Sequence, residues 1–565
     1  MKTKYQILLL IFLILLLYYI SISSPVNSVD DYDMFNRLLN LDSINLHHLF
    51  FPHCGGYYRP VCTLTYQIDR FLWLLEESFY HLENILIHTI NAVLVFLIAL
   101  KLFGERYKYV PFYAALLFGV HPINTEAVNW ISSRCDLLAT MFSLSGFLIF
   151  LKFKESKYWL IGVFVASFVA FFGALSKEVG VAFYPAIAMW VLFFEKDNFK
   201  NRTIQALIFI AFGLFYFYFR HIALIHSDES VHRVAKAVVH HDYLKDILII
   251  IQAFGFYVKK LFIPLPLNFG IIHISKIYLY VGFLVAFVSG LFLVLRKKSL
   301  GLFLVALWFV APGTLVALGH VAWTPYAERY VYTASAFFSM FFVFWLFELV
   351  YVKVENGKLF YVALSLLIGL CFALSFQRNL VWSSNLSLYK DTVEKSPDFV
   401  AGRNQYAIAL AKAGRNKKAI EEFKIAAYDN RSKQSILPLL NLIKFSDKSL
   451  EEKKRELYKF YKNKKKNLPN SVIKKILYNI LYINNKIIKE NPTKTVSILS
   501  ENACIYQKLF ECTHNGFYLY KEAQMYLTIK DYKKAKECLK ETKKHLDKNS
   551  LYYKMADRLL KKIGD

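Results

Sequence analysis

The stretch FYAALLFGVHPINTEAVNWISSRCDLLATMFSLSGFLIFL, residues 112–151, shows how the larger, N-terminal part of this chain is built. Two apolar runs, centred near Leu116 and Leu144, enclose a polar segment that begins with His121–Pro122. Apolar runs of this kind suit helices that cross a bilayer, whose hydrocarbon core is about 30 Å thick. Polar residues between two such runs are expected at a membrane surface. The stretch therefore predicts two membrane spans joined by a polar turn.

The same alternation continues along the chain in both directions. Tyr5–Ile20 is a first apolar run behind Lys2 and Lys4, which we interpret as a retained span with a cytoplasmic N-terminus rather than a cleaved signal peptide. The remaining runs are centred near Leu94, Val165, Ala188, Phe212, Phe287, Val305, Phe342 and Leu366. The sequence thus predicts about eleven spans.

The charges of the connecting loops predict the orientation. Short basic loops favour the cytoplasmic side, and here they are Lys101–Lys108, Lys152–Lys157, Lys196–Arg202, Arg296–Lys298 and Lys353–Lys358. The other loops and the C-terminus are then extracytoplasmic. Asp246–Pro266 is apolar but contains Lys259 and Lys260, so we interpret it as an interfacial or re-entrant helix on the outer side, with a true span as the alternative.

The composition supports a membrane protein and excludes other classes. Hydrophobic residues make up 56% of the 565 positions and aromatic residues 17%, which exceeds the apolar share of soluble domains. The net charge is +27. No nucleic-acid-binding motif accompanies that charge, so we assign it to inner loops and a solvated domain rather than to nucleic acid.

The seven cysteines form no CxxC and no His/Cys spacing that suits zinc. Cys54 with Cys62, and Cys504 with Cys512, are candidate disulfides if they lie outside the cytoplasm. Free, buried thiols are the alternative for both pairs.

The composition changes after Phe376, where lysine, glutamate and asparagine replace phenylalanine and leucine. Asn404–Ala426 fits the helix-turn-helix register of TPR repeats, with Gly414 at the turn, and a second match runs from Ala523 to Leu539. We therefore predict an all-α chain: a membrane domain over residues 1–376 with its first external loop at 21–78, a linker over 377–397, and an extracytoplasmic TPR-like α-solenoid over 398–565. Such a solenoid holds a peptide or protein partner, or it braces the membrane domain.

An acidic pair, Asp30–Asp31, follows the first span. One interpretation is a general base that takes the proton of an acceptor hydroxyl; the other is a cap on a short helix that runs to Leu39. Asp31–Tyr32–Asp33 also matches the DxD pattern of metal-dependent enzymes that use nucleotide sugars. We discount that match because nucleotide sugars are not expected outside the membrane.

The polar segment after His121 supplies the next candidates. If it is helical, Glu126, Trp130 and Arg134 share one face, and an arginine held by a carboxylate suits the phosphate of a lipid carrier. The alternative is a Glu126–Arg134 network that only orients the loop.

Two further outer turns are charged. In Ser176–Lys177–Glu178 the lysine either reaches a phosphate or snorkels to the interface. Glu328–Arg329 follows Thr324–Pro325, where a helix N-terminus beside an arginine would attract an anion. Arg59, in Tyr58–Arg59–Pro60, is another outer arginine.

These motifs, in this order, resemble the transmembrane-and-TPR-containing protein O-mannosyltransferase-like proteins, and the chain looks like a bacterial relative of them. The motifs that carry the resemblance are Asp30–Asp31, Tyr58–Pro60, His121–Ala139, Ser176–Glu178 with Pro185, Leu265–Leu267, Glu328–Tyr332 and Arg378–Trp382. The sequence departs from the pattern in three places: Asn27–Val29 before the acidic pair, Cys135 after the arginine, and Ala334 where proline is usual.

The resemblance implies a GT-C fold with the active site on the outer side of the bacterial cytoplasmic membrane. It implies a polyprenyl-phosphate sugar as donor, inversion at the sugar carbon, a hydroxyl acceptor on protein, and neither metal nor other cofactor. Eukaryotic members are mannosyltransferases. The site residues carried over are Asp30 and Asp31 as the catalytic pair, with Asp30 as the base; Arg134, Arg329 and Lys177 at the donor phosphate; and Arg59, His121, Glu126, Asp136, Glu178 and Glu328 in support.

Three other functions remain open at this stage. Ligases and polymerases of surface polysaccharide also combine many spans with a TPR tail, although their large external loop usually comes late. A non-catalytic membrane scaffold would act through the TPR domain alone. A transporter is less favoured because no inverted repeat or pair of broken spans is evident.

Overall fold

The structure is a computed structural model that describes residues 3–39, 41, 43–52, 57–104, 109–224, 242–318, 322–351, 357–428, 436–464, 468, 470–548 and 550–563. Across these ranges the ordered elements are helices, and β-type pairing is limited to one bridge between Ile271 and Tyr326. The chain forms two compact units, Met1–Phe399 and Val400–Asp565.

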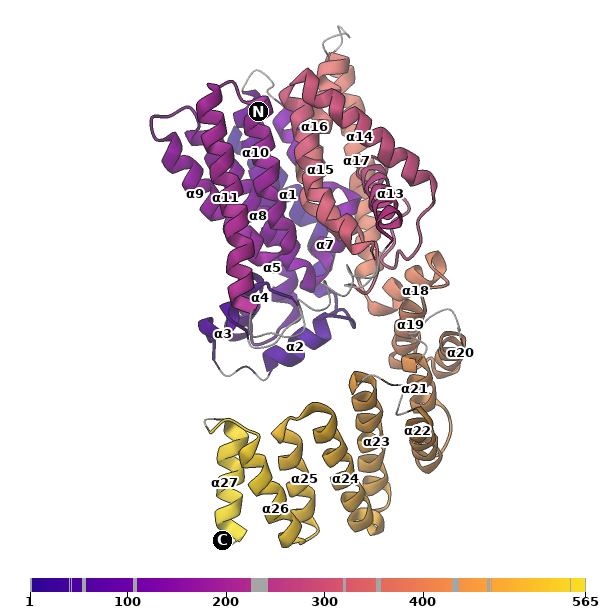
Figure 1. The fold of residues 1–565 in the computed structure, drawn as a ribbon. Helices are drawn as coiled ribbons and strands as arrows, with labels where there is room; N and C mark the ends of the chain where they lie inside the picture. The colour runs from indigo at the N-terminus through magenta and orange to yellow at the C-terminus, as the bar shows by residue number, and fades with distance from the viewer. Residues whose placement is uncertain are drawn as a thin grey trace. The chain divides into compact units, whose positions relative to one another are not determined.

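In the described part of the first unit, nine helical segments are long and apolar enough to cross a membrane (Figure 1). The helices that form them are α1 (Thr3–Tyr18), α5 (Glu77–Phe103), α8 (Arg134–Phe153), α9 (Trp159–Ser176), α11 (Phe199–Leu224), α14 (Ile277–Leu295), α15 (Lys298–Val316), α16 (Tyr332–Leu346) and α17 (Gly357–Trp382). They correspond to nine of the eleven predicted spans.

The two other predicted spans are shorter helices. The run at Leu116 forms α6 (Val110–Val120), which has 11 residues. The run at Ala188 forms α10 (Phe183–Phe194), which has 12 residues and follows the 3-10 turn η5 (Glu178–Ala182). At 1.5 Å per residue, α6 reaches about 16 Å, roughly half of the hydrocarbon core. Asp246–Pro266 lies largely in α13 (Tyr243–Phe262), which is not among the nine; its interfacial position stays a prediction.

The spans pack around one apolar core to which α1, α5, α6, α8, α10, α15 and α16 contribute buried side chains. Small residues permit close approach between helices. At Gly146 in α8, an added Cβ would lie 2.8 Å from the carbonyl oxygen of Ala166 in α9. In a bilayer, where burial of apolar groups gives helices little reason to associate, such close packing supplies much of the attraction between them.

Short helices gather at the end of this bundle away from the N-terminus, as Figure 1 shows. They include α2 (Asp31–Leu39), α3 (Leu46–Phe50) and α4 (Pro60–Trp73), and the polar segment after His121 adds η3 (Pro122–Asn124), α7 (Thr125–Asn129) and η4 (Ile131–Ser133). The later chain supplies η6 (Glu328–Val331) and α18 (Asn385–Lys395). The residues predicted as a linker are helical here: 377–382 end α17, and 385–395 form α18.

A disulfide joins Cys62 in α4 to Cys135 at the start of α8, with the Cα atoms 5.4 Å apart. Neither alternative given for Cys62, a disulfide with Cys54 or a free thiol, is correct, because its sulfur is bonded to Cys135; Cys54 itself lies outside the described residues. Cys504 and Cys512 are free thiols on one helix, α24 (Thr495–Thr513). Eight residues of helix place them about 12 Å apart, too far for a bond.

The second unit consists of successive helices: α19 (Val400–Lys412), α20 (Asn416–Ala427), α21 (Ile436–Phe445), α22 (Leu450–Lys464), α23 (Asn470–Glu490), α24, α25 (Gly516–Thr528), α26 (Tyr532–Lys544) and α27 (Leu551–Ile563). Gly414 lies in the turn between α19 and α20 with φ +75°, a conformation that glycine adopts without strain. Ala407, Ala419 and Phe423 are fully buried between the two helices. The helix-turn-helix predicted at Asn404–Ala426 is present, and its assignment as a TPR stays a prediction.

Candidate functional site: a charge cluster at the end of the bundle

Asp30 lies immediately before α2, and its carbonyl oxygen accepts the backbone N–H of Met34 at 3.0 Å. The residue is exposed, and its carboxylate has no hydrogen-bond or ion-pair partner within the described ranges. Surrounding protein atoms displace part of its water and raise its pKa, while the positive charges of Arg329 and Arg59 lower it. Asp30 is therefore an accessible carboxylate beside two guanidinium groups.

Asp31 has a different environment. It is buried, and its carboxylate accepts the backbone N–H groups of Asn27 and Ser132, both at 2.9 Å, as well as the hydroxyl of Ser132. Burial raises the pKa of Asp31 to about 6, against these hydrogen bonds. Asp31 thus fastens the loop after α1 to the segment before α8, and this arrangement leaves Asp30 as the carboxylate that a substrate can reach.

Arg329, in η6, forms an ion pair with Glu126 of α7. The other oxygen of Glu126 accepts the backbone N–H of Glu328 at 3.0 Å. The guanidinium carbon of Arg329 lies 4.5 Å from the ring centroid of Trp130 and 4.7 Å from that of Tyr330. A carboxylate and two aromatic faces therefore fix one arginine, whose side chain keeps 11% of its surface exposed.

Two more cations are held in the same manner. Lys177 Nζ donates to Asp136 Oδ2 at 2.6 Å, and the guanidinium of Arg59 donates twice to Glu178 Oε2, at 2.9 and 3.1 Å. Burial lowers the pKa of Lys177; Asp136 opposes this shift, and the charges of Arg59 and Arg329 add to it.

Contacts place the three cations in one neighbourhood, because Lys177 Nζ and the guanidinium carbon of Arg329 lie 5.7 and 4.7 Å from the ring centroid of Tyr330, and Arg59 pairs with Glu178, the residue after Lys177. The charges of Arg329 and Arg59 lower the pKa of Asp30, and the same two charges lower the pKa of Lys177. The tertiary structure thus brings together side chains from positions 30, 59, 177 and 329. We call Asp30, Arg59, Lys177 and Arg329 the charge cluster. Among the described residues each cation pairs with one carboxylate, and an arginine or lysine has more N–H donors than one carboxylate can accept.

Arg134 is not in the charge cluster. Its side chain is only 1% exposed and pairs with Asp69 of α4 and with Glu83 of α5, the latter at 2.9 Å. It also donates to Asn84 Oδ1 at 3.0 Å and to the carbonyl oxygen of Tyr80 at 3.1 Å. Because protein acceptors occupy its donors, the structure gives Arg134 no route to a donor phosphate, and we withdraw it from the predicted phosphate site.

The helical face predicted for Glu126, Trp130 and Arg134 is also wrong. Residues 125–129 form α7, Trp130 is extended, and η4 separates it from α8. Glu126 therefore pairs with Arg329 rather than with Arg134. The i, i+4, i+8 spacing holds only in a continuous helix, and this segment bends twice.

The remaining predicted supports act within the protein framework. Glu328 accepts Lys260 Nζ at 2.8 Å and the backbone N–H of Asn268 at 2.9 Å. His121 accepts the N–H of Ile123 on Nδ1, so Nε2 carries the proton that it donates to the carbonyl oxygen of Leu261 at 3.1 Å. Burial lowers the pKa of His121 to about 4. Glu328 thus anchors α13 and the loop after it to η6, and His121 anchors α13 to the polar segment.

Sequence reasoning missed the contacts of α18. Asn385 Oδ1 accepts the backbone N–H of Ser28 at 3.1 Å, and its Nδ2 donates to the carbonyl oxygen of Val26 at 2.9 Å. The hydroxyl of Tyr389 donates to Asn27 Oδ1 at 2.9 Å and accepts from Ser28 Oγ at 3.1 Å. The loop that carries Asp30 is thus fixed by a helix more than 350 positions later in the chain, which no local signal announces. Asp69 and Glu83 were missed for the same reason.

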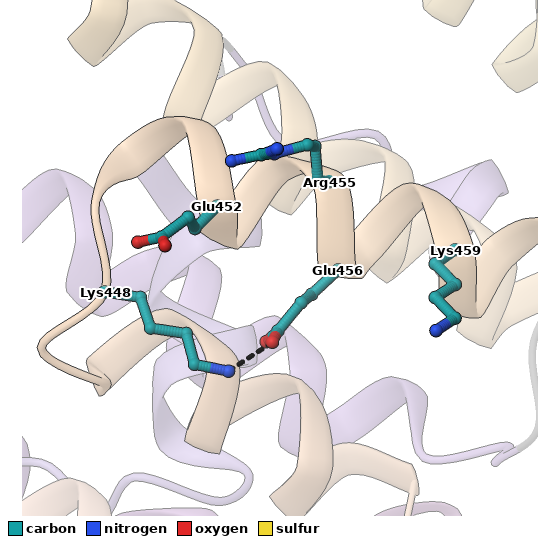
Figure 2. Close-up of a pocket in the computed structure, with 5 residues that line it drawn as sticks. All are labelled: Lys448, Glu452, Arg455, Glu456 and Lys459. Atoms are coloured by element: carbon teal, nitrogen blue, oxygen red, sulfur yellow. Dashed lines mark hydrogen bonds and ion pairs between the residues drawn. The ribbon is translucent and has the colours of Figure 1, made fainter.

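Among the residues that the structure describes, no group of three or more His, Cys, Asp and Glu side chains is arranged to hold a metal ion. The expectation that no metal is needed is left to experiment. On the second unit, Figure 2 shows a hollow lined by Lys448, Glu452, Arg455, Glu456 and Lys459, with Lys448 paired to Glu456. Its lining side chains are all charged, in both signs, and none is an apolar or aromatic side chain of the kind typical of small-molecule sites, so we assign it no ligand.

Fold and site together define a polytopic helical membrane protein with a cluster of fixed cations and the exposed carboxylate of Asp30 at an end of the bundle. No family model matches the chain. It is 34% identical to human protein O-mannosyl-transferase TMTC3 over 138 residues. This matched stretch covers 24% of this chain and 15% of that protein. Over 159 residues it is 32% identical to protein O-mannosyl-transferase F38B6.6 of Caenorhabditis elegans, 28% of this chain and 22% of that protein.

The match thus spans less than a quarter of the length of these two relatives. The predicted resemblance is confirmed to that extent, and bacterial origin stays a prediction. Among solved structures, the archaeal oligosaccharyltransferase AglB from Archaeoglobus fulgidus, in complex with an inhibitory peptide and a dolichol-phosphate, is similar over 67% of this chain and 56% of its own, with 13% identity and a TM-score of 0.39. We draw no conclusion from a score this low.

Proposed function

We propose that the protein is a membrane glycosyltransferase that moves a sugar, mannose by analogy with its named relatives, from a polyprenyl-phosphate donor to a hydroxyl on a protein. The observation that carries the proposal is the exposed carboxylate of Asp30, on which the charges of Arg329 and Arg59 act, at a site where Arg329 and Lys177 share the ring of Tyr330. A transfer of this kind needs a base at the attacking hydroxyl and positive charge at the departing phosphate, and the charge cluster contains both.

In the proposed reaction the acceptor oxygen attacks the anomeric carbon and gives its proton to Asp30. The bond between that carbon and the phosphate oxygen breaks, and its electron pair leaves with the phosphate. Arg329 and Lys177, with Arg59 beside them, stabilise the charge that develops on the phosphate. A single displacement inverts the configuration at the sugar carbon. Asp31 is a positioning residue in this scheme.

We further propose that the charge cluster faces the extracytoplasmic side. The Cys62–Cys135 disulfide has one cysteine in α4 itself, among the short helices at this end of the bundle, and disulfides persist in oxidising compartments. The basic loops that we expect in the cytoplasm are not the segments that contain Cys62 and Cys135. The second unit then lies outside as well, where it is available to hold the acceptor protein.

The test uses the purified full-length protein in nanodiscs with polyprenyl-phosphate mannose, an acceptor protein mixture and mass spectrometry of the products. Asp30→Asn is expected to lower transfer by about 100- to 10,000-fold, the usual contribution of a general base. Asp33→Asn, which changes an exposed carboxylate in α2 three positions after Asp30, is the matched control and should keep activity. Undiminished transfer by Asp30→Asn would remove Asp30 from the mechanism. A glycan acceptor in place of a modified peptide would favour a polysaccharide ligase.

A further inference from the structure

Three side chains outside the charge cluster bury N–H groups that have no acceptor. Nε and Nη2 of Arg378, and Nε1 of Trp130 and of Trp382, lack a hydrogen-bond partner anywhere in the described ranges. The side chain of Arg378 is 3% exposed, and Trp130 and Trp382 are equally well buried. A buried donor without an acceptor costs about 1–3 kcal/mol, more when it is charged.

The three side chains belong to one region of the first unit. Arg378 and Trp382 lie one turn apart on α17. Between them, Asn379 Oδ1 accepts Asn129 Nδ2 at 2.8 Å, which holds the segment containing Trp130 against α17. The ring of Phe269 contacts both indoles, with centroids 5.3 Å from Trp130 and 5.2 Å from Trp382.

The chemistry of this region requires an acceptor, and its charge favours an anion. Indole and guanidinium groups donate hydrogen bonds and accept none. Arg378 Nη1 donates to Asp391 Oδ2 at 2.6 Å, but Lys395 takes the other oxygen of Asp391, also at 2.6 Å. One carboxylate thus pairs with two cations, the buried Arg378 and the partly exposed Lys395, so Arg378 does not have Asp391 to itself.

We propose that Arg378, Trp382 and Trp130 form an inner anion site that binds the oxygens of a phosphate group. The site adjoins the charge cluster, because the indole of Trp130 lies under the guanidinium of Arg329. The inference rests on the proposed function for the identity of the phosphate: either the phosphate of the lipid donor reaches inward from Arg329, or a free phosphate occupies the site.

The experiment measures binding without sugar transfer. Full-length protein in nanodiscs is titrated with polyprenyl phosphate in one arm and with inorganic phosphate in the other. The variants are Trp382→Phe, which removes one N–H and keeps a ring, and Arg378→Gln. Trp323→Phe is the matched control, because Trp323 also packs on Phe269, with centroids 5.3 Å apart, and its N–H is not among the unpartnered buried donors.

We expect both variants to weaken the binding of polyprenyl phosphate about 10-fold or more, the usual effect of a hydrogen bond to a charged group, while Trp323→Phe leaves it unchanged. The same loss confined to inorganic phosphate would support the site with a free anion as its ligand. Unchanged affinity for both ligands, in variants whose thermal unfolding matches the parent protein, would overturn it and identify the donors as water-bound. Arg329→Gln separates the two proposals: if it alone weakens binding, the outer donor site stands and the inner one falls.

Discussion

Two arginines of this protein, Arg134 and Arg329, begin from the same expectation and end in different surroundings. Arg134 is buried, with two carboxylate partners and a protein acceptor at each of its three side-chain nitrogens. Arg329 has one carboxylate and two aromatic faces, and part of its side chain remains open. The difference teaches that the number of partners and the residual exposure separate a structural arginine from one that can bind an anion.

The difference between the two arginines is tested most directly by measuring the thermal stability of variants. Arg134→Gln leaves Asp69 and Glu83 without their cation in a buried site, and the loss of one partner of such a pair costs about 3–5 kcal/mol. We expect a marked drop in the midpoint of thermal unfolding. Arg329→Gln should lower it less and reduce sugar transfer more. If the two variants show equal stability, the assignment of Arg134 to the framework is wrong.

The disulfide, like Arg134, is part of the protein framework. Cys62 and Cys135 are 73 positions apart, so the double variant Cys62→Ala with Cys135→Ala should lose about 2–4 kcal/mol of stability, chiefly by freeing the unfolded chain. Reduction of the parent protein should lower its unfolding midpoint to the same value. Cys504→Ser, at a thiol that is already free, serves as the control and should change nothing.

A variant in helix α18 tests how the loop that carries Asp30 is held in place. Tyr389→Phe removes the hydroxyl that bonds Asn27 and Ser28, next to Asp30. A lost hydrogen bond of this kind is worth about 0.5–1.5 kcal/mol, so kcat should fall by up to about 10-fold with little change in KM for the donor. Hydrogen exchange of residues 26–30 should quicken in parallel. A change in KM alone would contradict a positioning role.

The smallest expected effect is a shift in pH dependence. Asp30 must be ionised to act as a base, so the transfer rate should fall as the pH drops through its raised pKa. Arg329 lowers that pKa, and Arg329→Gln should therefore move the acidic limb of the pH–rate profile to higher pH. Arg134 is not among the charges that act on Asp30, and a mild variant, Arg134→Lys, should leave the limb where it is. A downward shift in Arg329→Gln would contradict the proximity of the two groups.

Much of this molecule follows from its sequence. The apolar runs fixed the helices, because a chain in a bilayer must satisfy its backbone hydrogen bonds within each segment. Nine of the predicted spans have full length, and the other two are shorter because polar turns at His121 and Glu178 interrupt them. The family resemblance that the motifs carry implied a shared site for Asp30, Arg134, Lys177 and Arg329; the structure buries Arg134 elsewhere, and the roles of the other three stay predictions.

Partner choice was decided by the tertiary structure alone. Cys62 bonds Cys135 rather than its neighbour in sequence, Glu126 takes Arg329 rather than Arg134, and α18 holds the loop before Asp30. Each of these contacts joins segments far apart in the chain. A residue type states which bonds a side chain can make, but burial and helix packing determine which partner is within reach, and these depend on all the helices at once.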